Sequence, residues 1–196
     1  NFNVPVGALF VNHINGVIYK LNGITNFSAS GVTFINYGLV RVNSGECILN
    51  LASTHYGIIR AYGSGIFRFA SGIANFNGVS RFGGTNHIIV SGATLNFNFA
   101  SSLDTVTFEL LSGIVQGSDS LHFLPYSKFH WNGGTVQGSV VINIHLQATM
   151  VWAGGTKDFR GSAIINNYCH SIWTAGDLRY YDGGAIFNNY NVFTID

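Results

Sequence analysis

The sequence predicts an all-β fold, namely a single-stranded parallel β-solenoid (β-helix) of about nine coils, each with roughly 21 residues and three short strands. Tryptophan returns at positions 131, 152 and 173, a constant step of 21 residues. Glycines separate short runs rich in β-branched and aromatic residues, and no segment shows the helical period of 3.6. An antiparallel sandwich does not require such a fixed interval, whereas stacked coils place equivalent positions about 4.8 Å apart. The spacing therefore favours the solenoid.

Three sets of strands follow the same period. The first strand of each coil is expected at 17–21, 39–42, 58–61, 79–82, 120–123, 140–144, 163–167 and 185–189. The second strand, which carries the tryptophans, is expected within 66–72, 88–92, 108–113, 129–134, 150–155 and 171–176. The third strand is expected at 73–77, 93–99, 114–118, 135–139, 156–162 and 177–183. The register near 100–106 is irregular.

The tryptophan position of the second strand is expected to face the core. Side chains alternate along a strand, so a solvent-facing Arg68 or Glu109 turns the residues on either side of it inward. The predicted ladder of large apolar side chains is Phe69, Ile89, Leu110, Trp131, Trp152, Trp173 and Phe193. Stacking these side chains inside the coil would stabilise the fold by burial and by ring contacts.

Composition limits the kind of protein. Charged residues make up 9% of the chain, against roughly 25% in an ordinary soluble domain. No run of about 18 apolar residues occurs, so we expect no membrane-spanning segment. We expect one solenoid domain over residues 1–196, which is either a segment of a longer chain or a fibre subunit. Cys47 and Cys169 fall six coils apart, about 29 Å, so no disulfide should join them.

The first strands carry a set of cations, Lys20, Arg41, Arg60 and Arg81, at steps of 21, 19 and 21 residues. Stacked like charges are unfavourable unless an anion lies beside them. The set therefore predicts either a polyanion-binding stripe, with an acidic polysaccharide as one possible ligand, or a solvated and salt-screened ladder. At the matching position of later coils, an amide ladder is expected from Asn143, Asn166 and Asn188.

Charge also divides along the expected rod. Residues 1–100 contain five Lys or Arg and one Glu, a net charge of +4, and residues 101–196 contain four Lys or Arg and seven acids, a net charge of −3. Ends of opposite charge suit head-to-tail association of one copy with another, although chance also produces such divisions.

Chemistry-bearing groups are sparse. Polysaccharide lyases and hydrolases need clustered carboxylates, and the best group here, Asp158, Asp177 and Asp182, reads more simply as turn-capping residues. His122, His130 and His145 fall in adjacent coils without a metal-ligand spacing. We expect no catalytic residue, no metal, no cofactor and no nucleic-acid partner. Asn26 heads an Asn-Phe-Ser glycosylation pattern, which coincidence explains in so Asn-rich a chain.

The repeats "WNGGTVQGS", "WAGGTKDFRGS" and "WTAGDLRYYDGG", with "IINNY" and "IFNNY" between them, resemble Gly- and Asn-rich parallel β-helix proteins of cell surfaces. Examples of that class are the passenger regions of autotransporter adhesins and filamentous-haemagglutinin-like proteins. The resemblance implies an extracellular rod with a structural or adhesive role and no catalytic residues to transfer. This chain departs from the class in its high content of Phe, Tyr and Ile.

The leading functional expectation is therefore an extracellular or cell-surface structural or adhesive rod, not an enzyme, that assembles end to end or adjoins further coils of a longer chain. The alternative is a polyanion- or carbohydrate-binding module that uses the cation set. An ice-binding protein is less favoured, because the threonines do not form a Thr-x-Thr array. A polysaccharide lyase or hydrolase is the least favoured reading.

Overall fold

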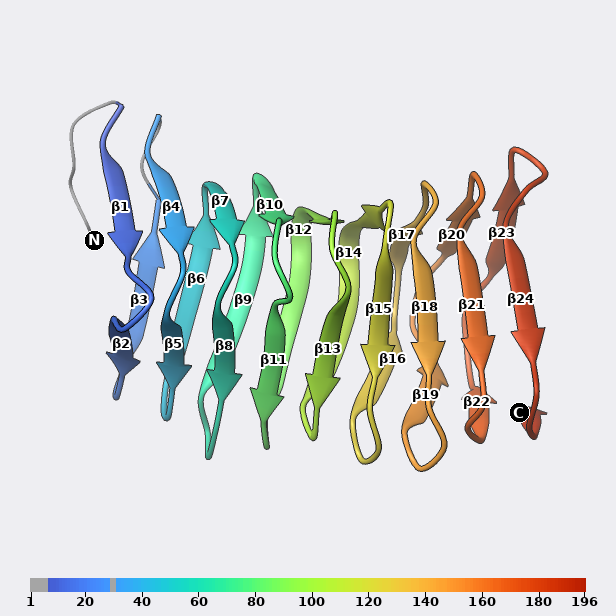
Figure 1. Ribbon diagram of the computed structural model, residues 1–196. Helices are drawn as coiled ribbons and strands as arrows, with labels where there is room; N and C mark the ends of the chain where they lie inside the picture. Colours follow the sequence, from blue (N-terminus) through green and yellow to red (C-terminus); the bar gives the residue numbers. More distant parts are fainter. Residues whose placement is uncertain (1–6, 29–30) are drawn as a thin grey trace.

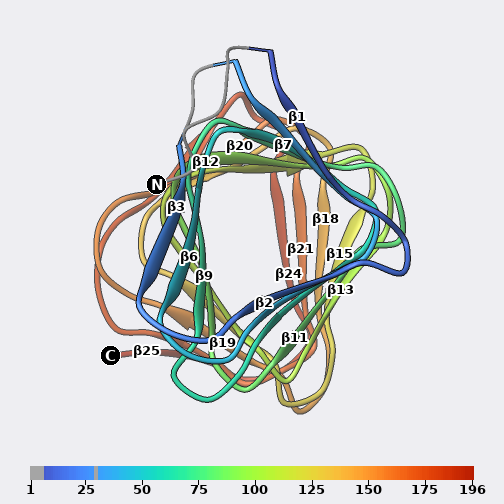
Figure 2. The same ribbon diagram turned by 90° about the vertical axis from the view of Figure 1, so that its left-hand side faces the viewer.

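The computed structural model describes residues 7–28 and 31–196, and the secondary structure of these residues is entirely β. All strand pairs are parallel, and successive coils stack into a rod of about nine turns that repeat roughly every 21 residues (Figure 1). Viewed along the rod, each coil is a rounded triangle with one strand on each side (Figure 2). The predicted β-solenoid is confirmed.

The three sides are here called face 1, face 2 and face 3, in the order in which each coil visits them. Face 1 contains β2 (Val17–Lys20), β5 (Leu39–Val42), β8 (Ile58–Ala61), β11 (Arg81–Gly84), β13 (Ser101–Asp104), β15 (Ser120–Phe123), β18 (Val141–Ile144), β21 (Ile164–Asn167) and β24 (Ile186–Asn189). Face 2 contains β3 (Ile24–Phe27), β6 (Glu46–Asn50), β9 (Ile66–Ser71), the first halves of β12 (His87–Phe97) and β14 (Thr107–Gly117), β16 (Lys128–Trp131), β19 (Thr149–Trp152), β22 (Ser171–Trp173) and β25 (Phe193–Ile195). Face 3 contains β1 (Leu9–Asn12), β4 (Thr33–Asn36), β7 (Ala52–His55), β10 (Ile73–Phe76), the second halves of β12 and β14, β17 (Gly134–Val136), β20 (Lys157–Arg160) and β23 (Leu178–Tyr181).

Two long strands change how the faces connect. Strands β12 and β14 each continue for eleven residues around the corner between faces 2 and 3. Faces 2 and 3 therefore form one sixteen-stranded sheet, while face 1 is a separate nine-stranded sheet. The irregular stretch near 100–106 contains a strand that the sequence pattern did not show, β13.

Five of the seven residues predicted for the core ladder share one register, and two do not. The column runs through Leu49, Phe69, Val90, Leu110, Trp131, Trp152, Trp173 and Ile195. Ile89 is instead level with Arg68 and Glu109 on the alternate phase, because β12 lacks the extra residue that β9 and β14 insert before the corner glycine. Phe193 is opposite Ser171, two positions before the ladder residue Ile195, although its ring still packs on the core.

The glycines that follow the tryptophans make the turn from face 2 to face 3. Gly134 has a φ of 78° and Gly176 a φ of 80°, a left-handed conformation that glycine adopts without strain. A Cβ on Gly176 would lie 2.3 Å from the carbonyl oxygen of Gly154 in the preceding coil. The repeated glycine therefore permits both the turn and the close stacking of one corner on the next.

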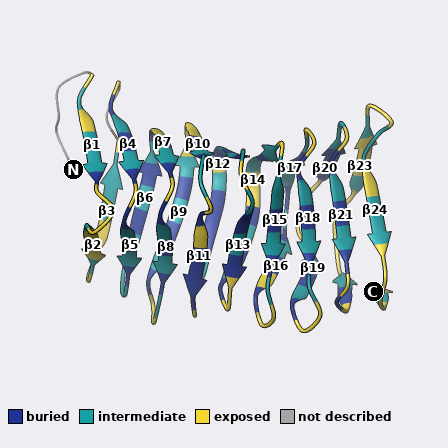
Figure 3. Ribbon diagram, viewed as in Figure 1, coloured by how far each residue is buried: buried dark blue, intermediate teal, exposed yellow. Residues whose placement is uncertain are grey.

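The interior is filled by aromatic rings. Trp131 and Trp152 are fully buried, and their ring centroids lie 5.0 Å apart. Trp173 continues the stack at 6.0 Å from Trp152, but it is only partly buried, because its strand, β22, lies close to the C-terminal end of the rod (Figure 3). Burial thus rises from the terminal coils to the central ones.

Amide and tyrosine ladders run parallel to the core. Asn166 donates its side-chain N–H to the Asn143 oxygen and Asn188 donates to the Asn166 oxygen, each over 2.9 Å, so the three asparagines of face 1 form a hydrogen-bonded column. At a neighbouring corner the rings of Tyr168 and Tyr190 stack with centroids 4.7 Å apart. Such ladders pair polar side chains with the coils above and below without using charge.

Replacing Trp152 by alanine should lower the free energy of unfolding by about 3–5 kcal/mol, the range for deleting a buried aromatic side chain. Its indole N–H has no hydrogen-bond partner in the described part of the chain, so the loss is one of packing. The matched variant Trp173→Ala should lower the free energy of unfolding by clearly less, because that ring is partly exposed. Urea unfolding followed by circular dichroism measures both. Equal losses would contradict the ladder as the source of stability.

Candidate functional site

The outer surface of face 1 carries the predicted cations, but not as one column. Arg41 and Arg60 are in register. Arg81 is paired with Ile58, and the residue opposite Arg60 is Gly83. Gly83 lies 23 positions after Arg60, because this coil is two residues longer than the 21-residue period. Arg81 therefore belongs to the neighbouring outward column.

Lys20 is also displaced. It is level with Val42, since Tyr19 takes the position opposite Arg41, and its amine donates to the backbone carbonyl of Asn22. The predicted continuous stripe of four cations is therefore wrong in register, and only Arg41 and Arg60 stack directly.

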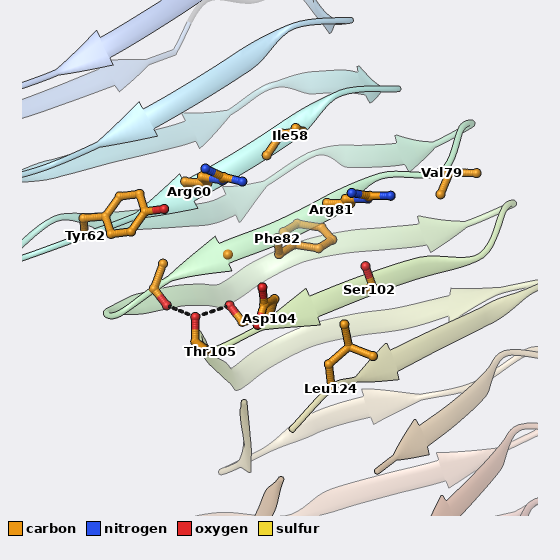
Figure 4. Close-up of a pocket in the computed structure, with 12 residues that line it drawn as sticks. Ile58, Arg60, Tyr62, Val79, Arg81, Phe82, Ser102, Asp104, Thr105 and Leu124 are labelled. Atoms are coloured by element: carbon orange, nitrogen blue, oxygen red, sulfur yellow. Dashed lines mark hydrogen bonds between the residues drawn. The ribbon is translucent and has the colours of Figure 1, made fainter. Parts of the chain in front are cut away.

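A groove lies where the column lacks a side chain. Gly83 stands between Arg60 on one coil and Asp104 on the next, in register with both. The resulting depression has a volume of about 410 Å³ and is lined by strands β8, β11 and β13, by residues of their adjoining turns, and by Leu124, which follows β15 (Figure 4). A Cβ built on Gly83 would lie 3.8 Å from Cγ and Nε of Arg60. The side chain of Arg60 thus passes beside the position that Gly83 leaves empty.

The charges of the groove are not neutralised by their neighbours. In the described part of the chain, the side chains of Arg60, Arg81 and Asp104 form no ion pair and no hydrogen bond. Arg41, by contrast, donates to the Asn43 side chain over 2.7 Å, and its guanidinium lies 4.6 Å from the centre of the Tyr62 ring. The groove therefore presents two available guanidiniums and one available carboxylate.

The wall of the groove includes a strained residue. Thr105 has a φ of 58°, a region that β-branched residues rarely adopt and that costs on the order of 1–3 kcal/mol. Its hydroxyl is 3.0 Å from the Gly84 carbonyl oxygen and 2.7 Å from that of Asp104, and it donates at this corner. The backbone of Gly84 packs so closely on the preceding coil that a Cβ would lie 1.9 Å from the Ala61 carbonyl oxygen. The turn at this edge of the groove is thus held by its surroundings.

The carboxylate group singled out from the sequence is organised differently. Asp158 accepts hydrogen bonds from Arg179 over 2.8 Å and from Arg160 over 2.7 Å on face 3. Burial alone would raise the pKa of Asp158, but the hydrogen bonds and charges of the two arginines more than offset this and lower it. A general acid needs a raised pKa, so this arrangement suits a structural ion cluster. Asp182, with a φ of 64°, occupies a turn.

Two of the three histidines singled out from the sequence meet. His122 Nδ1 lies 3.1 Å from His145 Nε2, and His122 Nε2 lies 3.0 Å from the Ser120 hydroxyl. Burial, followed by the nearby His145, lowers the pKa of His122. His130 lies on face 2 beside Glu109 and does not join them. Over residues 7–28 and 31–196, no group of three His, Cys, Asp or Glu is placed to hold a metal ion.

The remaining singled-out residues have structural surroundings. Cys47 and Cys169 are both buried free thiols, and burial raises the pKa of Cys47 to about 12. Asn26 lies within β3, where its side-chain oxygen accepts a hydrogen bond from Asn50 over 2.7 Å.

The threonines of face 3 do not form the continuous rows that an ice-binding surface would need. Thr94 and Thr135 are separated by Ile114 in the same column.

Compared with known proteins, the chain matches no family model, no curated protein and no solved structure. The described residues contain no helix with the length and apolarity needed to cross a membrane.

Sequence reasoning identified Arg60 and Arg81 but missed Gly83, Asp104 and Thr105. The signal was present in "RFGG", where a glycine follows Phe82 at an outward position of a strand. A glycine inside a strand often marks a close backbone approach or a site where a ligand can reach the sheet. The strand that supplies Asp104 lay in the stretch of irregular period, so the two halves of the groove could not be aligned.

One titratable group of the core lies away from the groove. His55 on β7 is fully buried, its ring stacks on Phe76 with centroids 5.0 Å apart, and its Nε2 lies 3.0 Å from the Ser53 hydroxyl. Burial lowers the pKa of His55 to about 3. The folded protein therefore holds this imidazole in its neutral form, while the unfolded chain protonates it below about pH 6.5.

Acidification should destabilise the protein through His55. Between pH 6.5 and pH 3 the unfolded chain binds one more proton at this residue than the folded one, so stability falls as the pH is lowered, by about 2 kcal/mol from pH 7 to pH 5. His55→Phe should remove this part of the dependence, and the exposed control His13→Phe should keep it. Urea unfolding at pH 5, 6 and 7 gives the slope of the free energy of unfolding against pH for the wild type and for each variant. Parallel slopes for wild type and His55→Phe would contradict the assignment.

Proposed function

We propose that the protein is a non-catalytic structural rod of an extracellular or cell-surface assembly. The observation that carries the proposal is the continuous interior ladder, which gives one stiff body along about nine stacked coils. The sparse charge and the amide columns support it, because they let coils stack without like-charge repulsion. The resemblance to cell-surface β-helix adhesins agrees with this role.

The rod is also proposed to extend by stacking a further coil on its C-terminal coil, supplied by a second copy or by a longer chain. Asp196 donates its backbone N–H to the Trp173 carbonyl oxygen of the preceding coil. Because N–H groups alternate in direction along a parallel strand, that of Ile195 points to the open side. Ile195 is 71% exposed. Unpaired strand edges of this kind are templates for another strand.

Proline at Ile195 should block such stacking. The change removes the N–H on the open side while leaving the Asp196 hydrogen bond to the preceding coil in place. We expect the wild type to form multi-unit rods at high concentration, and Ile195→Pro to remain a single rod on the order of 40 Å long. The matched control Ile195→Val keeps both the N–H and the apolar surface and should assemble as the wild type does.

Sedimentation velocity and negative-stain electron microscopy measure this assembly, with circular dichroism as the check on folding. A wild type that stays monomeric at every concentration would overturn self-assembly, but not the proposal that the protein is a structural rod. Assembly of Ile195→Pro at the wild-type concentration would show that another surface mediates association.

A further inference from the structure

We propose that the groove on face 1 binds an acidic saccharide, a sugar chain that carries carboxylates among its hydroxyl groups. The site is formed by Arg60, Arg81, Gly83, Asp104 and Thr105. It does not depend on the rod being extended, because every lining residue lies in the middle coils of the described chain.

The two guanidiniums define the anionic half of the ligand. Arg60 and Arg81 come from adjacent strands and line one groove, in which neither forms an ion pair within the described residues (Figure 4). An arginine fork matches the two oxygens of a carboxylate, and the charge-assisted hydrogen bonds are about twice as strong as neutral ones. The other charged side chain of the lining is Asp104, which likewise forms no ion pair with any residue of 7–28 or 31–196. The arginines are thus free to engage a ligand without first breaking a bond in the protein.

The opposite wall defines the hydroxyl-bearing half. Asp104 offers carboxylate oxygens, and Ser102, in register with Arg81, offers a hydroxyl. The Thr105 hydroxyl directs its hydrogen to a backbone carbonyl, which leaves its oxygen to accept a hydrogen bond. Acceptors of this kind bind the O–H groups of a sugar. Ile58, Val79 and Leu124 complete the lining with apolar surface for the C–H faces of the ring.

The same carboxylate argues against a densely charged ligand. A polyphosphate or a run of acidic residues would bring several negative charges against Asp104, and like charges at short range repel. The supply of free cations is also small, because Arg41 is bonded to Asn43 and Lys20 lies off the column. A ligand with spaced carboxylates and neutral hydroxyls between them matches the groove better. Its volume of about 410 Å³ lies within the 300–1,000 Å³ typical of small-molecule sites.

The geometry offers a variant that closes the groove and keeps its charges. Gly83 is outside the left-handed region, and a Cβ there would meet its neighbours only at 3.6–3.8 Å, ordinary contact distances. Gly83→Leu can therefore be accommodated by the backbone while its side chain fills the space beside Arg60. Loss of binding in this variant reports on the shape of the site and not on net charge.

The test uses isothermal titration calorimetry of the full chain with a galacturonic acid trimer, and with the methyl-esterified trimer as the neutral match. The acid should bind and the ester should bind at least tenfold more weakly. Arg60→Gln and Arg81→Gln should each weaken binding of the acid tenfold or more, and Gly83→Leu should abolish it. Lys128→Gln, which removes an exposed cation on face 2, should leave it unchanged. Circular dichroism confirms that each variant is folded.

Asp104→Asn separates the saccharide from a polyanion. Removing this charge should weaken binding of the galacturonate trimer, because one of the two oxygens that accept from its hydroxyls is replaced by an N–H donor, and should strengthen binding of polyphosphate or polyglutamate, because a repelling charge is removed. The proposal is overturned if the trimer does not bind, if Gly83→Leu binds it as the wild type does, or if Lys128→Gln weakens it as much as Arg60→Gln. Tighter binding of polyphosphate than of the trimer by the wild type would overturn it in favour of a general polyanion site.

Discussion

The constraint on which the rest of the structure depends is the in-register stacking of parallel coils at about 4.8 Å. Equivalent residues of successive coils are brought into contact. Each column must therefore hold side chains that can pack against, or hydrogen-bond to, an identical or similar side chain. Rings satisfy this rule inside the rod, as Trp131 and Trp152 do. Amides satisfy it outside, where each donates to the one before it, as Asn166 does to Asn143. Charges satisfy it poorly, which accounts for a surface that is polar and yet carries few ionised groups.

The stacking rule explains which parts of the fold could be predicted from the sequence. A tryptophan every 21 residues is a direct trace of the repeat, and the alternation around Arg68 and Glu109 shows which phase faces inward. The errors arise at the corners, where residues are inserted or removed without changing the strands. Val90 takes the ladder position in place of Ile89 because the coil turns one residue earlier there. The spacing of residues along the chain therefore predicts which strand of the coil a residue lies on. It does not predict which residues are paired between coils where a corner gains or loses a residue.

At the candidate site, too, the spacing along the chain does not predict which residues are paired between coils. Arg41 and Arg60, 19 positions apart, are in register, while Arg60 and Arg81, 21 positions apart, are not. The more regular spacing was thus the misleading one, since the corner between those coils holds two additional residues. The sequence shows that cations gather on the first strands of the early coils. Only the stacked structure shows that Gly83, and not another arginine, follows Arg60 in its column, and that Asp104 follows Gly83.

A repeat fold can create a binding site by omitting a side chain from a column that is otherwise filled. In such a ladder each side chain covers its neighbour, so one glycine opens space on a flat sheet without bending any strand. Gly83 itself lies within β11 outside the left-handed region, and the positive φ values nearby are at Gly84, which glycine tolerates, and at Thr105 on the adjacent corner. Because the strands on both sides are held by pairing along the whole rod, Arg60, Arg81 and Asp104 project from a rigid surface. Rigid placement lowers the entropy that a ligand must offset on binding, so the stiffness that suits a structural rod also suits a small site displayed on its side.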